Sequence, residues 1–117
     1  YHDLHRDHMA LAYAGLVSSR PYLTRNRRQL RKVLMYETPT ETHLLPGSVE
    51  SPFVPNSYVD ISGTLQQKLD AWACYHSQQQ SGPTPRSMNA LKALAIWRGA
   101  HAGMEAAEAF MVIHEAA

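Results

Sequence analysis

The chain has 117 residues, enough for one small domain and too few for two. Apolar residues make up 44% of it and charged residues 18%, which is ordinary globular usage and argues against an intrinsically disordered chain. The formal net charge of +1 provides no strong overall field that would select nucleic acid or an anionic membrane.

The cysteine content and the length of the longest apolar run bear on the cellular compartment and on membrane insertion. Cys74 is the only cysteine, so the chain has neither an internal disulfide nor a cage of thiolates for zinc, and a reduced, cytoplasmic setting is predicted. The longest apolar run covers residues 9–17 and is well short of the roughly 18 to 20 residues that a membrane helix needs. We therefore expect no membrane partner.

The first half of the chain predicts one helix, one strand and one long loop. Apolar residues recur at helical spacing over residues 7–19, and a proline at position 21 stops the pattern. The sequence KVLMYE at 32–37 contains a short apolar run typical of a buried strand. Repeated prolines over residues 38–56 predict a surface loop, and long loops often carry function.

A strand followed by a helix is predicted next. The aromatic and β-branched residues of SYVDIS at 57–62 favour a strand. Ser62 or Thr64 is suited to cap the following helix, and Thr64 also forms a capping-box pattern with Gln67. Apolar residues then lie on one stripe over residues 65–76, until the polar run SQQQSG at 77–82 ends the helix.

The last third predicts one more helix and a closing strand. Thr84 has the character of an N-cap and Pro85 that of a first helical residue, so a third helix is expected from there to about Gly103. Residues 107–114 mix helix formers with strand formers, and we predict a strand, with more helix as the alternative. The whole chain, residues 1–117, is then a single α/β domain.

The stretch HDLHRDH at the start of the chain is its densest group of reactive side chains. His2, His5 and His8 are three residues apart and would share one face of a helix, where Asp3 and Asp7 could accept bonds from their rings. Imidazole and carboxylate suit zinc, which can activate a water for attack on a carbonyl. On spacing alone, histidines without a special role, or an affinity tag, are the commoner explanation.

The segment DLHRDH resembles the D-x-H-x-D-H segment of the PIG-L/LmbE family of zinc-dependent N-acetylglucosaminyl deacetylases. Further landmarks follow in the same order and resemble the bacillithiol-pathway branch of that family. They are YE at 36–37, F-x-P-N at 53–56, VDIS at 59–62, K-x-x-A-x-x-x-Y-x-S-Q at 68–78, RG at 98–99 and AEAF at 107–110. The resemblance thus extends over nearly the whole chain.

The resemblance implies zinc-dependent removal of an N-acetyl group from a glucosamine-type substrate. It implies that His8 is a zinc ligand, that His5 acts as acid or oxyanion stabiliser, and that Asp7 orients His5. The chemistry is sound on general grounds, because a histidinium held by a carboxylate can stabilise a developing oxyanion and then protonate the leaving amine.

The departures from the family pattern are equally informative. The family's other zinc ligands and its general base lie in an earlier H-P-D-D segment, and this chain contains no adjacent pair of aspartates. The resemblance therefore covers the C-terminal half of such an enzyme, a partial Rossmann-like three-layer α/β/α fold lacking the N-terminal strands. We expect the H-P-D-D segment on another chain or segment, and a homo-oligomer, trimer or hexamer, as in the family. Arg6 stands where proline is commoner.

Other interpretations stay open at this point. A catalytically inactive structural or binding domain is the main alternative to a deacetylase. The basic run at 25–32 could contact nucleic acid, but no aromatic residue is interleaved in it, so a solvated linker is favoured and no nucleic-acid partner is predicted. His43 could reach a substrate, and Arg98 and Glu108 could pair internally or contact substrate.

The aromatic residues predicted to lie in the core rather than to stack on sugars are Tyr36, Trp72, Trp97 and Phe110.

Overall fold

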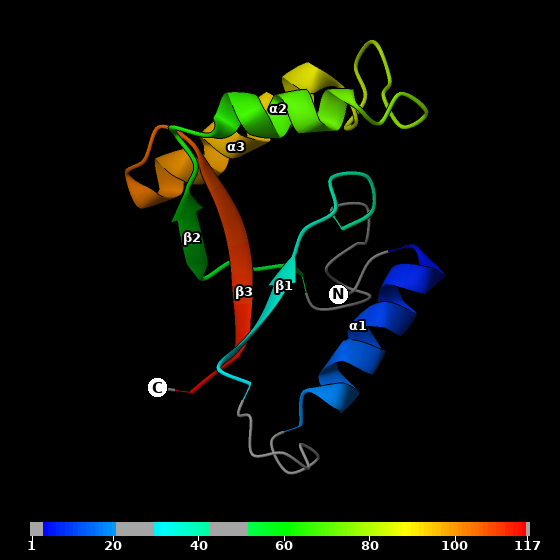
Figure 1. Cartoon of the computed structure of the whole chain (residues 1–117), viewed down its shortest axis with the longest axis vertical. Helices are drawn as coiled ribbons and strands as arrows, with labels where there is room; N and C mark the ends of the chain where they lie inside the picture. Colours follow the sequence, from blue (N-terminus) through cyan, green and yellow to red (C-terminus); the bar gives the residue numbers. More distant parts are fainter. Residues whose placement is uncertain (1–3, 21–29, 43–51, 117) are drawn as a thin grey trace. The chain divides into compact units, whose positions relative to one another are not determined.

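The computed structural model describes residues 4–20, 30–42 and 52–116 and shows a mixed α/β fold, which confirms the predicted class at that level (Figure 1). Within these ranges lie three helices and three strands. In chain order they are α1 (Arg6–Ser18), β1 (Lys32–Tyr36), β2 (Ser57–Asp60), α2 (Leu65–Ala73), α3 (Met88–Ala102) and β3 (Ala107–Glu115).

The three strands form one sheet in the order β1-β3-β2, with β3 in the middle. β1 and β3 are antiparallel, with Tyr36 opposite Phe110 and Lys32 opposite Glu115, and a register shift interrupts the ladder between Val33 and Leu34. An ion pair of 3.1 Å between the Lys32 ammonium and the Glu115 carboxylate closes the end of this ladder. The strands predicted at 32–37, 57–62 and 107–114 are thus confirmed, and β3 is a strand rather than helix.

Asn56 ties the segment before β2 to β3. Its backbone N–H donates to the Phe110 carbonyl at 3.0 Å, and its side-chain Oδ1 accepts from the Val112 N–H at 2.8 Å. After β2, the Ile61 N–H donates to the Ala106 carbonyl at 3.0 Å. Asn56 therefore extends the backbone ladder of β3 with a side-chain bond.

Internal contacts group the chain into two compact units, which are described separately. The first contains residues 1–57 and 110–117, and the second contains residues 58–109. The single domain expected from the sequence stays a prediction.

The second unit is packed through small residues. α2 and α3 contact each other, and the buried positions are Leu69 on α2, Ala95 and Gly99 on α3, and three alanines at 106, 107 and 109. At Gly99 the helix α3 lies very close to the backbone of the residues that follow it. A Cβ at this position would lie 2.6 Å from the Met104 carbonyl oxygen. α3 ends as predicted at Gly103, whose φ of 70° is a left-handed conformation that glycine adopts without strain.

In the first unit, Met35 on β1 is buried, with 8% of its surface exposed. α1 has no buried residue, and its Leu11 and Tyr13 are about 70% exposed. The helix predicted at 7–19 is confirmed in position. Among the described residues, however, none packs over Leu11 or Tyr13 closely enough to bury it.

A hydrogen-bonded turn connects β2 to α2. The Asp60 carboxylate accepts from both the backbone N–H and the hydroxyl of Ser62, at 2.9 and 2.5 Å, and the same hydroxyl oxygen accepts from the Ala106 N–H at 3.2 Å. The hydroxyl bond first, and the backbone bond second, lower the pKa of Asp60 below its usual value of 3.8.

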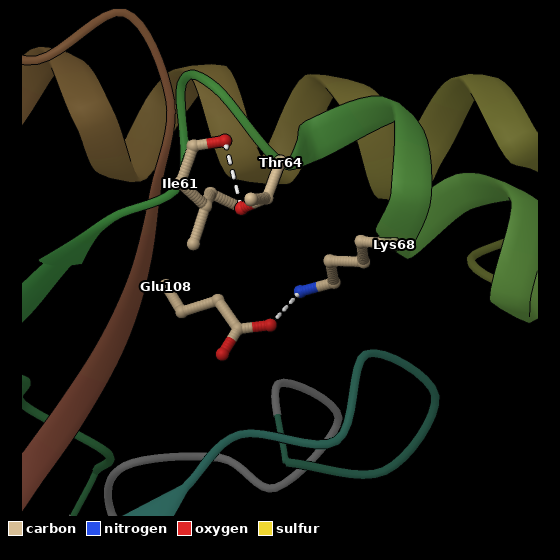
Figure 2. Close-up of polar contacts among 4 residues, drawn as sticks. All are labelled: Ile61, Thr64, Lys68 and Glu108. Atoms are coloured by element: carbon tan, nitrogen blue, oxygen red, sulfur yellow. Dashed lines mark hydrogen bonds and ion pairs between the residues drawn. The ribbon is translucent and has the colours of Figure 1, made fainter.

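Of the two predicted helix starts in this unit, the start of α2 after Thr64 is confirmed and the start of α3 needs correction. Thr64 is the N-cap of α2, but its side chain makes no capping bond, since Oγ1 contacts the Ile61 carbonyl instead (Figure 2), so the capping box with Gln67 is wrong. α3 begins at Met88 rather than at Pro85. Its N-cap is Ser87, whose hydroxyl accepts from the Ala90 N–H at 3.2 Å.

Other expectations are corrected or limited by the structure. α2 ends at Ala73, short of the predicted residue 76. Tyr36 and Trp97 are more than 60% exposed, so their assignment to the core is wrong for the described residues, while Trp72 and Phe110 are half-buried. No helix in the described part of the chain is long and apolar enough to cross a membrane.

The close approach at Gly99 predicts a stability effect. We expect Gly99→Ala to lower the free energy of unfolding by about 1 to 3 kcal/mol, because the added methyl meets backbone atoms that cannot move aside easily. Urea unfolding of the full chain measures the change. Gly15→Ala in α1 is the matched control, since nothing lies within 4 Å of its new Cβ, and a gain of about 0.5 to 1 kcal/mol is expected there. Equal midpoints for Gly99→Ala and the native chain would contradict the packing described.

The turn at Asp60 predicts a pH effect. Because its pKa is lower in the folded than in the unfolded chain, Asp60 contributes stability above pH 3.8 that is lost as the pH falls through the folded pKa. Ser62→Ala should raise the Asp60 pKa toward its usual value and reduce this acid sensitivity. NMR titration of the Asp60 carboxyl carbon measures the shift, with Thr64→Ala as the control, and an unchanged titration in Ser62→Ala would refute the assignment.

Candidate functional site

The first turn of α1 brings together the two histidines that the sequence singled out. The rings of His5 and His8 stack with centroids 4.5 Å apart and planes 23° apart. His5 and Asp7 are exposed, and His8 is half-buried. His2 and Asp3, the other members of the sequence cluster, lie outside the described residues.

Local geometry explains this stacking. His5 is the N-cap of α1, with an extended backbone, and its Nδ1 accepts a bond of 3.2 Å from the Asp7 backbone N–H. His8 follows three residues later, and residues three apart lie on the same face of a helix. The His-x-x-His spacing therefore places the two rings side by side once the helix starts at this point.

The His5 ring has two alternative partners on Asp7. As an acceptor from the backbone N–H, Nδ1 carries no proton, so a neutral ring holds its proton on Nε2. The same Nδ1 lies 3.9 Å from Asp7 Oδ2, an ion pair that requires a protonated ring. The two interactions exclude each other, and the shorter hydrogen bond fits the neutral form. Protonation would exchange the helix cap for the carboxylate of Asp7.

His8 also lines a groove within the first unit. The groove has a volume of about 410 Å³ and lies between α1 and β1. The residues that line it are largely apolar and include Leu11, Ala12, Leu30, Val33, Leu34 and Met35. An apolar hollow with an imidazole at its wall is a common setting for ligand binding, because polar groups act more strongly where water is excluded.

The donors at this site match zinc in type but are too few. A catalytic zinc site uses three protein ligands and one open position. Among the residues that the structure describes, no group of three histidine, cysteine, aspartate or glutamate side chains could hold a metal ion.

Lys68 and Glu108, which belong to the sequence patterns at 68–78 and 107–110, meet between α2 and β3 (Figure 2). The Lys68 ammonium of α2 pairs with Glu108 Oε1 of β3 at 2.5 Å, and both side chains are partly exposed. This answers one open question, because Glu108 pairs internally. No local pattern in the sequence indicates Lys68 as this partner, because forty residues separate the two. Arg98 is half-buried on α3, and His43 lies outside the described residues.

The Y-x-S-Q sequence at 75–78 is hydrogen-bonded to the loop that precedes α3. Gln78 Oε1 accepts from Arg86 Nη1 at 2.8 Å, and the Arg86 carbonyl accepts from the indole N–H of Trp72 at 3.3 Å. Tyr75 is 61% exposed and stacks loosely on Trp72, with centroids 6.1 Å apart. Arg86 was missed by sequence reasoning, because it stands alone between a proline and a serine and belongs to no charged motif.

The Lys68–Glu108 pair predicts a small stability contribution. A double-mutant cycle of Lys68→Met and Glu108→Gln, followed by urea unfolding, should give a coupling energy of no more than about 1 kcal/mol, because both groups remain in contact with water. The coupling should decrease in high salt. A coupling of several kcal/mol that is insensitive to salt would show that the pair is shielded from solvent.

A scan against protein-family models, a search of curated proteins and a search of solved structures found no match to this chain.

Proposed function

We propose that the chain is the C-terminal half of a zinc-dependent N-deacetylase that hydrolyses the N-acetyl group of a glucosamine-type substrate. In this proposal His8 is a zinc ligand, His5 is the acid or oxyanion stabiliser, and Asp7 orients His5. An H-P-D-D segment on another chain or segment supplies the remaining ligands and the general base. The order of landmarks in the sequence is the starting point.

The observation that carries the proposal is the position of His8. Its ring stacks on that of His5 and lines an apolar groove, which is where a metal ligand next to a catalytic acid would have to lie. If the ring faced bulk solvent, or if His5 were remote, the two residues could not act on one substrate. The stacking therefore supports a shared role.

The chain's own residues would act on the leaving amine. When bound, zinc would supply Lewis-acid polarisation of the acetyl carbonyl and an acidified water. His5 would carry a proton in its active form, with Nδ1 turned from the Asp7 N–H to the Asp7 carboxylate. Nε2 would then stabilise the developing oxyanion and donate its proton to the leaving nitrogen.

The fold proposed with this function is a partial Rossmann-like three-layer α/β/α structure completed by further strands. β1 supports this, because it ends the sheet order and its residues 33–36 form an unbroken apolar run. Such runs are typical of strands covered on both faces, yet Leu34 is 37% and Tyr36 64% exposed among the described residues. A cytoplasmic homo-oligomer, trimer or hexamer, with an N-acetylated amino-sugar substrate completes the proposal.

The test is a reconstitution. The full chain is mixed with a second polypeptide that carries the H-P-D-D half of a family deacetylase, and zinc content and acetate release from N-acetylglucosamine-type substrates are measured. Zinc binding and acetate release are expected from the mixture and not from the chain alone, because one histidine does not hold zinc. Stoichiometric zinc with acetate release by the 117 residues alone would refute the split site.

Variants separate the roles in the reconstituted enzyme. His8→Ala should lose bound zinc, whereas His5→Ala should keep zinc and lose about 10²- to 10⁴-fold in kcat, the usual effect of removing a general acid. Asp7→Asn should also keep zinc and shift the pH dependence, because it removes the carboxylate from the ring. His76→Ala, an exposed histidine outside the site, is the matched control. Failure of every combination to release acetate would favour the inactive binding domain.

A further inference from the structure

The second unit contains a groove that the proposed function does not use. It lies where α2 leads into the loop before α3 and has a volume of about 310 Å³. The residues that line it are Trp72, Gln79, Gln80, Ser81, Arg86 and Met88. Among them one side chain is cationic and none is acidic.

Arg86 is half-buried at this groove and has no carboxylate partner among the described residues. Its guanidinium carries five N–H donors, and its bond within the described chain is the one from Nη1 to Gln78 Oε1. Partial burial of a cation without a counter-ion is unfavourable, so an anion at this position would be stabilised. The planar fork of donors fits the two oxygens of a carboxylate or phosphate.

An apolar wall lies beside this cation. The indole of Trp72 is held in place by its N–H bond to the Arg86 carbonyl, and Met88 adds a thioether side chain that is 37% exposed. Gln79 is fixed as well, because its side-chain amide donates to the Ala73 carbonyl. The groove therefore offers one fixed apolar surface immediately next to one guanidinium.

We infer that this groove binds a small organic anion in which a carboxylate or phosphate is attached to an apolar or aromatic ring. The anion contacts the Arg86 guanidinium, and the ring packs on Trp72 and Met88. Gln80 and Ser81 at the rim are available for the remaining oxygens. The inference stands independently of the deacetylase proposal.

The experiment titrates the isotopically labelled full chain with phenyl phosphate, benzoate, inorganic phosphate and neutral benzyl alcohol, and follows the Trp72 indole N–H by NMR. Saturable shifts are expected with phenyl phosphate and benzoate, with weaker binding of inorganic phosphate and benzyl alcohol, because each presents only one of the two features. Equal affinity for inorganic phosphate and phenyl phosphate would overturn the role of the apolar wall.

Charge variants test the role of Arg86. Arg86→Gln should weaken phenyl phosphate binding by about ten-fold or more, and Arg86→Lys should give an intermediate loss, since it keeps the charge without the fork. Lys92→Gln makes the same change of charge on the exposed face of α3, outside the groove, and should change affinity by less than about two-fold. Equal losses in Arg86→Gln and Lys92→Gln would mean non-specific attraction and overturn the site.

The native chain decides the outcome if Arg86→Gln does not fold. Shifts confined to Trp72, the loop 79–81 and the Arg86 side chain would then support the site. Absence of saturable shifts at millimolar ligand, or shifts elsewhere in the chain, would overturn it.

Discussion

The antiparallel pairing of β3 with its neighbours is the constraint on which much of this structure depends. β3 pairs with β1, more than seventy residues earlier, and adjoins the segment that contains Asn56 and β2. Within the second unit, the Ile61 N–H bonds the Ala106 carbonyl just before β3, and Glu108 of β3 pairs with Lys68 of α2. A one-residue slip of β3 would turn its side chains to the other face and remove the Lys68–Glu108 pair.

Several landmarks of the deacetylase-like pattern have structural roles in this chain. Asn56 bonds the backbone of β3, the Asp60–Ser62 turn starts the path into α2, and Gly99 permits the close approach of the segment at 104–106. Lys68 and Glu108 connect a helix to a strand. Each of these residues therefore has a role in the fold that does not depend on the chemistry of the site. Asn56, Ser62, Lys68 and Glu108 act through their side chains, and Gly99 acts because it has none.

The residues suited to chemistry make contacts of a different kind. The Nδ1 of His5 has two mutually exclusive partners on Asp7, and the Arg86 guanidinium is bonded to a neutral amide rather than to a carboxylate. A cation that already pairs with a carboxylate of the chain, such as Lys68, has less capacity to bind another anion. His8 lines one groove and Arg86 lines the other, which places one imidazole and one guanidinium where a ligand could reach them.

The sequence by itself determined those features that depend on neighbours within about one helical turn. The run Val33–Tyr36 indicated a strand, the pattern after His5 indicated α1, and Gly103 ended α3. The three-residue spacing of His5 and His8 was enough to predict that their rings share a face. Even at this scale one predicted cap was wrong: Ser87 rather than Thr84 starts α3, because its hydroxyl reaches the Ala90 N–H. Only the tertiary structure decided the partner of Glu108, the exposure of Trp97, the close contact at Gly99 and the groove beside His8. The partner of Glu108 lies forty residues away, and the groove joins residues of α1 to residues of β1. The contact at Gly99 is made by residues 104 and 106, and it follows from how the chain turns back after α3 rather than from local preference.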